Sequence, residues 1–341
     1  MQLHGEAVIK EISVSEVRHL DIWRPLGNSG IMVSPVALGC WPIAGVTTLD
    51  TNEADSIATI QACFDVGVNH IDTAYVYGSR GESETLVGRA VVGRRDEMVI
   101  ATKCGIHYEG NAMVNDGRPE RLRAECEESL RRLGTDRVEL LYLHAPDENV
   151  PIEDSAGVLS ALVQEGKTRS AGASNCTIDE LEAFAKICPL TAVQMPYNKL
   201  QRDIEQRTIP WCRERNIAVM VYWPLMKGLL AGRLARDHQF HERDSRRNYP
   251  MYQGDEWQKN QDFVARLREA AALSRHTVAQ LVINWTISQP GITSALCGAK
   301  RPWQIEELAG AMGWTLGREQ LAMIDAALAE RGTAAAKRYF T

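Results

Sequence analysis

Three ionisable side chains stand where three successive apolar runs of the sequence end. Asp72 closes the run VNHID, Lys103 closes MVIATK and His144 closes VELLYLH. If these runs are neighbouring parallel strands, their ends lie about 5 Å apart, so the three side chains can meet. Each residue alone has a structural interpretation, because acids cap turns and lysines extend to the surface. Together, at adjacent strand ends, the three indicate acid–base chemistry.

Two tyrosines follow Asp72 in the stretch NHIDTAYVYG, and either is a candidate proton donor. A free phenol, with a pKa of about 10, is too weak an acid to protonate an alkoxide readily near neutral pH. Asp72 would keep Lys103 protonated, and a protonated lysine makes a neighbouring phenol a better acid. This reasoning leaves both Tyr75 and Tyr77 open. It prefers Tyr77 modestly, because Gly78 gives the loop freedom to turn back over the site.

Eight short strand-like runs recur along the chain, with segments of helical periodicity between them. The runs are Pro35–Gly39, Val68–Asp72, Met98–Lys103, Val138–His144, Arg169–Ser174, Ala192–Met195, Ile217–Tyr222 and Thr293–Cys297. Runs that are apolar throughout fit a parallel sheet covered on both faces, and eight such units close into an α/β fold of the (β/α)8 TIM barrel type. The alternative is an open doubly wound sheet. No GxGxxG turn follows the first run, so the barrel is preferred.

Two segments interrupt this alternation. Arg24–Val33 contains an Asn-Ser-Gly turn and predicts an N-terminal β-hairpin that caps the bottom of the barrel. The segment Met226–Trp257, after strand 7, is long, polar and irregular, which is typical of a lid or of a disordered loop. We therefore expect a single domain over residues 1–341, with an N-terminal extension at 1–23, the barrel at 24–330 and a C-terminal tail at 331–341.

Composition excludes several classes of function. The net charge of -6 and the lack of a basic block argue against a nucleic-acid partner. No apolar stretch is long enough for a membrane span, and the N-terminus lacks a secretory h-region. The eight cysteines show no CxxC spacing and no cluster with histidine, so we expect reduced thiols, no metal site and a cytoplasmic location. The oligomeric state stays open.

With these residues in view, the chain resembles the aldo-keto reductases from about Arg24 to its last helix. NHIDTAYVYG resembles the family's Asp-x4-Tyr segment, which carries over Asp72 and Tyr77 and leaves out the other tyrosine. ATKCG and YLHAPD resemble the segments with the family's lysine and histidine, here Lys103 and His144. The resemblance implies that Tyr77 is the proton donor and that His144 orients the carbonyl.

Further segments resemble the family's NADP(H) site. GASN and the next strand would hold the nicotinamide amide, the first aromatic of YWPL would stack on the nicotinamide, and the GLL loop would fold over the pyrophosphate. Lys300 and Arg301, before a helix N-terminus, would favour a 2′-phosphate and hence NADPH over NADH. The cofactor residues implied in this way are Cys40, Trp41, Ser174, Asn175, Gln194, Tyr222, Trp223, Pro224, Leu225, Gly228, Leu230, Arg233, Gly298, Lys300, Gln304 and Glu307.

The substrate pocket is expected to be partly aromatic. Trp41, His107 and Tyr108, together with Tyr77 and Trp223, are candidates to line it, which suggests small or aryl aldehydes. Two positions depart from the family pattern. Trp223 replaces the usual serine and puts the substrate range in doubt, and Leu308 stands where an asparagine often contacts the adenine. Within the family, the sequence motifs most resemble those of a bacterial branch of general-stress-type reductases.

The resemblance implies an oxidoreductase that reduces aldehydes or ketones to alcohols, with hydride from nicotinamide C4 of NADPH and a proton from Tyr77. One alternative is an NADP(H)-binding redox sensor or regulatory subunit with little turnover, like the potassium-channel β subunits. A related alternative is thiol sensing by cysteines at or just after strand ends, namely Cys40, Cys104, Cys176 and Cys297. A barrel enzyme of another class, such as an isomerase or metal-dependent hydrolase, is disfavoured because only Asp72 and His144 could serve as ligands.

Overall fold

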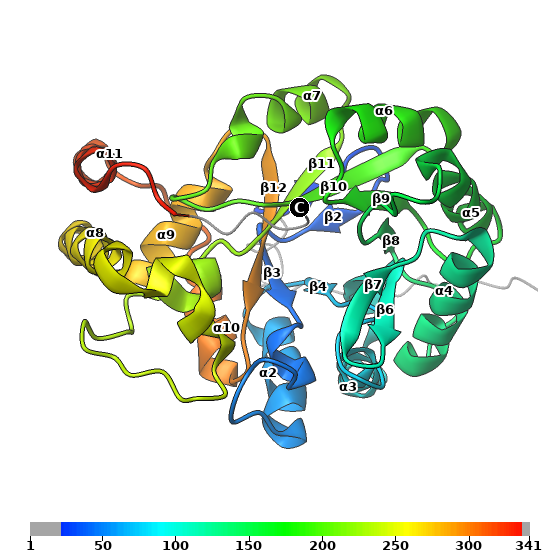
Figure 1. Cartoon of the computed structure of the whole chain (residues 1–341), viewed down its shortest axis with the longest axis horizontal. Coiled ribbons are helices and arrows are strands. Elements are labelled where there is room, and N and C mark those ends of the chain that lie inside the picture. Colours follow the sequence, from blue (N-terminus) through cyan, green and yellow to red (C-terminus); the bar gives the residue numbers. More distant parts are fainter. Residues whose placement is uncertain (1–21, 336–341) are drawn as a thin grey trace, which may run out of the picture.

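The computed structural model describes residues 22–335 and contains a closed barrel of eight parallel strands surrounded by helices (Figure 1). In chain order the barrel strands are β3 (Val36–Gly39), β4 (His70–Asp72), β5 (Val99–Cys104), β8 (Leu140–Leu143), β9 (Ala171–Ser174), β10 (Leu190–Pro196), β11 (Ala218–Tyr222) and β12 (Ile292–Gly298). Strand β12 pairs with β3 and closes the barrel. The predicted TIM barrel is confirmed. Residues 1–21 of the predicted N-terminal extension (1–23) and residues 336–341 of the predicted C-terminal tail (331–341) lie outside the described residues.

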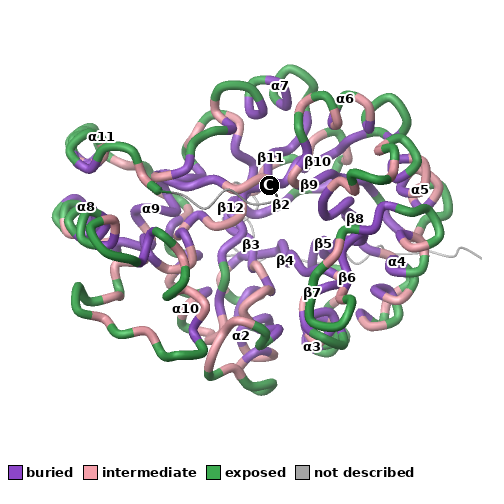
Figure 2. The backbone as a smooth tube through the Cα atoms, in the orientation of Figure 1, coloured by how far each residue is buried: buried purple, intermediate pink, exposed green. Residues whose placement is uncertain are grey.

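Helices cover the outside of the barrel. They are α2 (Glu53–Asp65), α3 (Glu82–Ala90), α4 (Pro119–Leu133), α5 (Ile152–Gln164), α6 (Ile178–Ile187), α7 (Thr208–Glu214), α8 (Gly254–Ala272), α9 (Val278–Ile287), α10 (Pro302–Ala309) and α11 (Arg318–Arg331). Local signals explain several of their ends. Pro119 opens α4, Gly134 closes it in the left-handed region, and Thr177 caps α6 in a capping box with Glu180. Figure 2 shows buried strands inside and exposed helix faces outside.

The N-terminal hairpin closes the bottom of the barrel, as predicted. Its strands are β1 (Arg24–Pro25) and β2 (Met32–Val33), which pair antiparallel. Leu26 and Ile31 are buried in one cluster with Leu140 and Met220, whose side chains come from the barrel strands β8 and β11. This apolar plug fills the end of the barrel opposite the strand carboxyl ends, so any site must be built at the other end.

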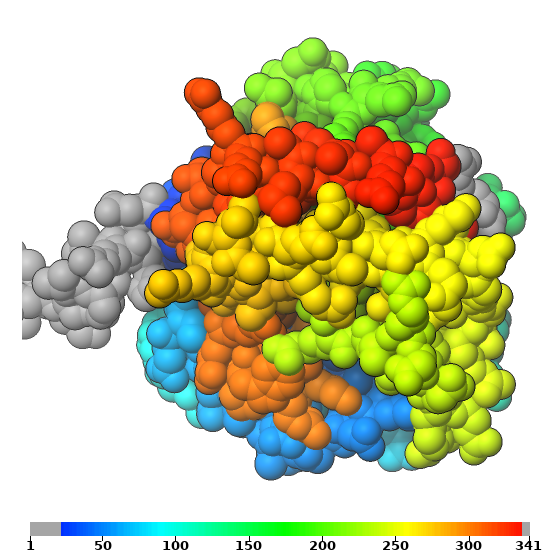
Figure 3. Space-filling model, turned by 90° about the vertical axis from the view of Figure 1, so that its left-hand side faces the viewer, coloured from blue at the N-terminus to red at the C-terminus, as the bar shows by residue number. Residues whose placement is uncertain are grey.

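The long segment after β11 is ordered rather than structureless. It contains three short 3-10 turns, η4 (Met226–Ala231), η5 (Ser245–Asn248) and η6 (Pro250–Tyr252), and it runs into the first residues of α8. Leu230, Met251 and Tyr252 are buried in a second apolar cluster with residues of α8, α9 and α11. In Figure 3 the segment lies beside the yellow atoms of α8. Its own small core gives it a defined position at the barrel mouth.

A second hairpin, which the sequence did not reveal, follows β5. Its strands β6 (Ile106–Glu109) and β7 (Ala112–Asn115) pair antiparallel between the barrel strand and α4. The remaining 3-10 turns, η1 (Pro42–Ala44), η2 (Arg95–Glu97) and η3 (Asp203–Glu205), belong to connections. Among residues 22–335, no helix is long and apolar enough to cross a membrane. The same residues contain no cluster of three or more metal-ligating side chains.

Candidate active site

Lys103 is the centre of the group at the barrel mouth. Its Nζ donates to Asp72 Oδ1 at 2.6 Å, to the carbonyl of Thr73 at 2.7 Å and to the hydroxyl of Tyr77 at 3.2 Å. The lysine is fully buried and Asp72 is 2% exposed. The structure therefore brings an acid, a lysine and a phenol into one hydrogen-bonded chain, as the strand-end argument requires. The Thr73 carbonyl is a partner that no side-chain pattern could reveal.

The structure separates the two tyrosines. The chain after β4 continues to pair with β5, because the amide of Tyr75 donates to the carbonyl of Lys103. The Tyr75 ring lies under the guanidinium of Arg132, 4.3 Å from the ring centroid, and so faces α4. The Tyr77 hydroxyl instead accepts from Lys103. The turn after it needs glycine, because Gly78 has a φ of +102° and a Cβ there would collide with Glu82.

Burial and charge act in opposite directions on the two titrating groups of this chain. Burial alone lowers the pKa of Lys103, but the charge of Asp72 and the contact with Tyr77 raise it above its usual range. Burial raises the pKa of Tyr77, and the positive charge of Lys103 opposes that rise. The expected acidifying effect of the lysine is therefore present, but burial outweighs it. At neutral pH the site holds an ammonium beside a neutral phenol, which is ready to give up a proton.

His144 lies on the other side of the phenol. Its ring centroid is 5.9 Å from that of Tyr77, in an edge-on arrangement. Burial, helped by the charge of Lys103, lowers the pKa of His144 well below its usual value, so the imidazole is neutral. Its Nδ1 is buried without a hydrogen-bond partner among the described residues. A neutral imidazole next to the phenol can donate to an oxygen that lies between the two.

The residues expected to hold a nicotinamide amide also meet at this mouth. The amide of Asn175 donates to the His144 carbonyl and to Ser174 Oγ, both at 3.0 Å. The Tyr222 hydroxyl donates to Asn175 Oδ1 at 2.8 Å. Asn175 has a φ of +61°, a conformation that asparagine tolerates better than most residues. Three strand ends thus contribute to one polar patch beside the phenol.

Gln194 links this patch to the acid. Its Nε2 donates to Asp72 Oδ2 at 2.8 Å, while Lys103 occupies Oδ1 of the same carboxylate. Because both carboxylate oxygens have partners, Asp72 is held in one orientation. The sequence predicts Gln194 only as a residue of the cofactor site. The structure adds a contact between Gln194 and the hydrogen-bonded chain of Asp72, Lys103 and Tyr77.

A second group of predicted cofactor residues surrounds the beginning of α10. Gln304 Oε1 accepts from the backbone amide of Lys300 at 2.8 Å, and Arg233 pairs with Glu307 at 2.6 Å. Lys300 Nζ donates to the carbonyl of Leu49 at 2.5 Å. Gly298 ends β12. Together with Arg301 these side chains place three cations around a helix N-terminus, a setting that suits a phosphate group.

The turn between these two groups of residues has an unusual backbone conformation. Trp223, Met226 and Lys227 all have positive φ, and Gly228 follows with a φ of +93°. Such conformations cost free energy in residues with side chains and cluster at binding sites. The Lys227 ammonium lies 4.5 Å from the ring centroid of Trp223. The predicted residues Pro224, Leu225 and Leu230 lie in or beside the same turn, and Leu230 is fully buried.

The predicted pocket residues divide into two sets. Trp41 packs edge-on against Tyr77 at a centroid distance of 5.1 Å, and Tyr108 packs against the same small cluster as Tyr77. His107 points the other way, because its Nδ1 lies 3.3 Å from Glu125 Oε1 on α4. The geometry therefore keeps Trp41 beside the phenol, places Tyr108 on the apolar cluster that Tyr77 also contacts, and makes His107 an anchor of the β6–β7 hairpin. Cys40 lies below, with its amide bonded to the Asp72 carbonyl at 2.8 Å.

The cysteines near strand ends are poor candidates for redox sensing. Cys40, Cys104, Cys176 and Cys297 are all buried and unpaired by disulfides. Burial raises the pKa of each of these thiols above its usual value. A protonated, inaccessible thiol reacts slowly with oxidants. These side chains therefore act as small apolar fillers of the core.

Arg132 and Glu84 are supporting residues that sequence reasoning missed. Arg132 Nη1 donates to the Tyr75 carbonyl at 3.0 Å and to Glu84 Oε2 at 3.1 Å. Glu84 accepts in turn from Thr102 Oγ1 at 2.6 Å and has no exposed surface. These contacts join α4, α3 and β5 around the loop that carries Tyr77. An arginine near the end of a charged helix gives no such signal in the sequence.

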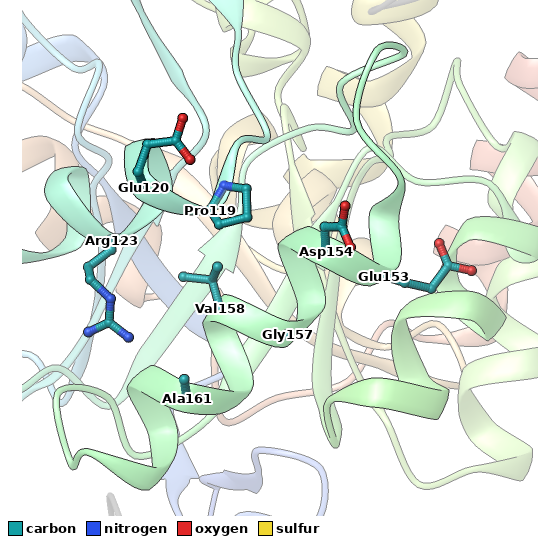
Figure 4. Close-up of a pocket in the computed structure, with 8 residues that line it drawn as sticks. All are labelled: Pro119, Glu120, Arg123, Glu153, Asp154, Gly157, Val158 and Ala161. Carbon is teal, nitrogen blue, oxygen red and sulfur yellow. The ribbon is translucent and has the colours of Figure 1, made fainter.

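A hollow in the surface formed by the described residues lies away from this mouth. It has a volume of about 440 Å³, lies between α4 and α5, and is lined by residues such as Pro119, Arg123, Glu153 and Val158 (Figure 4). None of the residues predicted to act lines it. The mouth of the barrel, where the titrating side chains converge, is therefore the candidate active site.

Comparison with known proteins agrees with this geometry. The model of the Aldo/keto reductase family matches residues 35–329. The aldo-keto reductase YhdN of Bacillus subtilis is 36% identical over 298 residues, which are 86% of this chain and 89% of that protein. The solved glycerol dehydrogenase AKR11B4 of Gluconobacter oxydans is 34% identical, with a TM-score of 0.83 over 91% of this chain and 96% of its own.

A more distant structure was solved with a cofactor. The aldo/keto reductase of Klebsiella pneumoniae, in complex with NADP and acetate, is 26% identical, with a TM-score of 0.68 over 88% of this chain and 93% of its own. The family model, the relatives and the fold agree, and the family model spans the barrel strands and the residues at their mouth. The chain belongs to the aldo-keto reductase family and is an oxidoreductase of that family.

Proposed function

We propose that the protein reduces small aldehydes or ketones to alcohols with NADPH, and that Tyr77 donates the proton. The observation that carries this proposal is the hydrogen-bonded chain from Asp72 through Lys103 to the Tyr77 hydroxyl. In the chemistry of the family, bound NADPH supplies a hydride to the carbonyl carbon. Side chains of the protein orient the carbonyl group and supply the proton.

Tyr77 and His144 act on the carbonyl oxygen. As hydride reaches the carbon, negative charge grows on the oxygen, and the Tyr77 hydroxyl gives its proton to that oxygen. Lys103 lies 3.2 Å from the hydroxyl and favours the phenolate that remains. His144, neutral and edge-on to the phenol, donates a hydrogen bond that orients the carbonyl and stabilises the developing oxyanion. Trp41 and Tyr108 exclude water from one side of the site.

The residues present fit an NADP cofactor. Ser174, Asn175 and Gln194 offer donors and acceptors at the mouth that match a carboxamide, and Tyr222 provides an aromatic face beside them. At the other end, Lys300, Arg301 and Arg233 place positive charge around the start of α10, where a 2′-phosphate would be stabilised. The NADP complex of the Klebsiella pneumoniae relative supports the same choice.

Two observations narrow the expected class of substrate: the aromatic side chains near Tyr77 and the similarity to a protein of described activity. Trp41 packs edge-on against Tyr77, and Tyr108 packs against the same apolar cluster as Tyr77, so aromatic rings are available near the phenol for contact with aryl aldehydes. The 34% identical protein from Gluconobacter oxydans is described as a glycerol dehydrogenase. A first panel should therefore contain glyceraldehyde and dihydroxyacetone, simple dicarbonyls and benzaldehydes.

The test is turnover by the purified protein, followed as loss of NADPH absorbance. We expect Tyr77→Phe to lower kcat by about 10²–10⁴-fold, as the loss of a general acid does, and to leave the Kd for NADPH nearly unchanged. Tyr75→Phe is the matched control, because Tyr75 faces α4, and it should retain activity. Tight NADPH binding without turnover of any panel member would instead favour a redox sensor. Loss of activity in Tyr75→Phe alone would show that the wrong tyrosine was assigned.

A further inference from the structure

Lys199 is a buried lysine that shares no contact with the catalytic chain. It is 1% exposed, and its Nζ has no hydrogen-bond partner among the described residues. The nearest carboxylate oxygen, Asp325 Oδ1, lies 4.0 Å away on an exposed side chain. The ammonium instead rests on Trp285, 3.5 Å from its ring centroid. A buried ammonium without a close anionic partner is costly, so its retention calls for an explanation.

The backbone holds this lysine in place. Lys199 lies in the connection between β10 and α7, where Asn198 and Gln201 exchange two backbone hydrogen bonds of 3.1 Å each. Trp285 beneath it is fixed by stacking on Tyr197, with ring centroids 5.8 Å apart. The tight turn and the stacked rings leave the ammonium little freedom to reach solvent. Its position is therefore a defined feature of the fold rather than one conformation of a mobile side chain.

Beside the lysine lies a cavity of about 310 Å³. It is bounded by the Lys199 turn on one side and by Leu328 and Thr333, at the end of α11, on the other. Gln201 also lines it, is 6% exposed, and has an Oε1 without a hydrogen-bond partner among the described residues. The volume lies at the lower end of the range for small-molecule sites. One cavity is thus lined by two buried side chains, Lys199 and Gln201, each with a polar atom that has no hydrogen-bond partner among the described residues.

We propose that this cavity is a binding site for a small hydroxycarboxylate. The ligand carboxylate pairs with the Lys199 ammonium, which can only donate hydrogen bonds, and the ligand hydroxyl donates to Gln201 Oε1, which can only accept. Leu328 and Leu200 contact the carbon skeleton. A single negative charge suits the site better than a phosphate dianion, because Asp325 and Glu205 lie near the lysine and Arg202, which also lines the cavity, is already paired with Glu205. The site shares no residue with the active site and does not depend on the proposed reaction.

The protonation state of Lys199 makes ligand binding at this site depend on pH. Burial lowers the pKa of Lys199 to about 7, with Arg202 acting in the same direction and Asp325 and Glu205 opposing it. Only the ammonium form attracts a carboxylate, and a bound carboxylate raises the pKa of Lys199. Binding at pH 7 or above is therefore coupled to proton uptake, and affinity falls by about tenfold between pH 6 and pH 8.

The experiment is calorimetric titration of the full chain with lactate and with acetate. Lactate should bind saturably and more tightly than acetate, with proton uptake revealed by buffers of different ionisation enthalpy. Lys199→Met keeps an unbranched side chain on Trp285 but removes the charge, and it should abolish binding of both anions. Lys186→Met removes an exposed lysine as the matched control and should change nothing. Gln201→Leu should bring the affinity for lactate down to that for acetate.

Two results would overturn the proposal. One is the absence of saturable lactate and acetate binding at pH 6, which would mean that water alone fills the cavity. The other is binding that persists in Lys199→Met or that shows no fall between pH 6 and pH 8. The pH series uses the unaltered protein, so the proposal remains testable even if the methionine variant does not fold.

Discussion

At the residue scale, the central feature is the balance of forces on the Tyr77 phenol. Burial raises the pKa of Tyr77, and the positive charge of Lys103 opposes that rise. The lysine therefore limits how far burial weakens the acidity of the phenol. Asp72 stabilises the lysine through one oxygen and accepts from Gln194 through the other. The phenol stays protonated at neutral pH, and in the proposed reduction the adjacent charge would ease its conversion to phenolate.

This balance predicts the pH dependence of a Lys103→Met variant. Removing the charge that lowers the pKa of Tyr77 must raise that pKa further. Reduction needs the protonated phenol, so the alkaline limb of the kcat profile should move to higher pH. At neutral pH kcat should fall by about 10²-fold or more, because the phenolate left after proton transfer loses its neighbouring charge. The measurement is the pH profile of kcat for wild type and variant. An alkaline limb that moves to lower pH would contradict the assignment.

At the element scale, α3 and α4 hold the loop that carries Tyr77. Arg132 on α4 binds the Tyr75 carbonyl and Glu84 on α3, and Glu84 binds Thr102 on β5. Strand ends could be predicted from sequence because an apolar run stops where a polar residue begins. This cross-link could not, because Arg131 and Arg132 look alike on a charged helix and only the packing distinguishes them.

Arg132→Met should loosen this loop. The variant leaves Glu84 buried without its cation, and loss of one partner of such a pair destabilises a fold by roughly 3 kcal/mol. We expect a lower free energy of unfolding and a reduced kcat, with a smaller effect on the KM for NADPH. Arg131→Met is the control, because the Arg131 side chain is itself 72% exposed. The double variant Arg132→Met with Glu84→Gln should recover part of the stability. Equal effects of the two arginine variants would refute a special role for Arg132.

The β6–β7 hairpin depends on a second buried acid, Glu125 of α4. This carboxylate accepts from the Gly105 amide at 2.6 Å and from Arg121 Nε at 2.8 Å, and it faces His107. Burial raises the pKa of Glu125 to about 7, although Gly105 and Arg121 oppose the shift. The hairpin that covers the Tyr77 cluster is thus attached through a group that titrates near neutrality.

A raised carboxyl pKa has a definite consequence for stability. The folded state binds the proton more tightly than the unfolded state, so this contribution is complete below pH 4.5 and is lost as pH rises to about 7. The loss amounts to about 3 kcal/mol. Glu125→Gln should remove it, so the variant should gain stability relative to wild type between pH 4.5 and pH 7. Chemical unfolding at a series of pH values measures the difference. A stability difference that stays constant over this window would show that Glu125 is already ionised throughout.

At the scale of the whole molecule, the barrel explains why the sequence was informative about the site. Parallel strands carry their carboxyl ends to one face, so residues at strand ends are predictable neighbours however far apart they lie in the chain. The β6–β7 hairpin and the packed segment after β11 were not predictable in the same way. Their positions depend on tertiary contacts, such as the burial of Met251 and Tyr252, that no local periodicity encodes.

The two ends of the proposed cofactor site follow β9 and β12, which two strands separate in the barrel, and they predict separable effects. Lys300 and Arg301 lie before α10, whereas Ser174 ends β9 and Asn175 follows it. If Lys300 binds the 2′-phosphate, Lys300→Ala should raise the Kd for NADPH by about tenfold or more and leave the Kd for NADH almost unchanged, because only NADPH carries that group. Lys259→Ala, which removes an exposed lysine of α8, should alter neither. Fluorescence titration with both nucleotides makes the comparison. A parallel loss of affinity for NADPH and NADH would mean that Lys300 acts by holding the Leu49 loop rather than by binding phosphate.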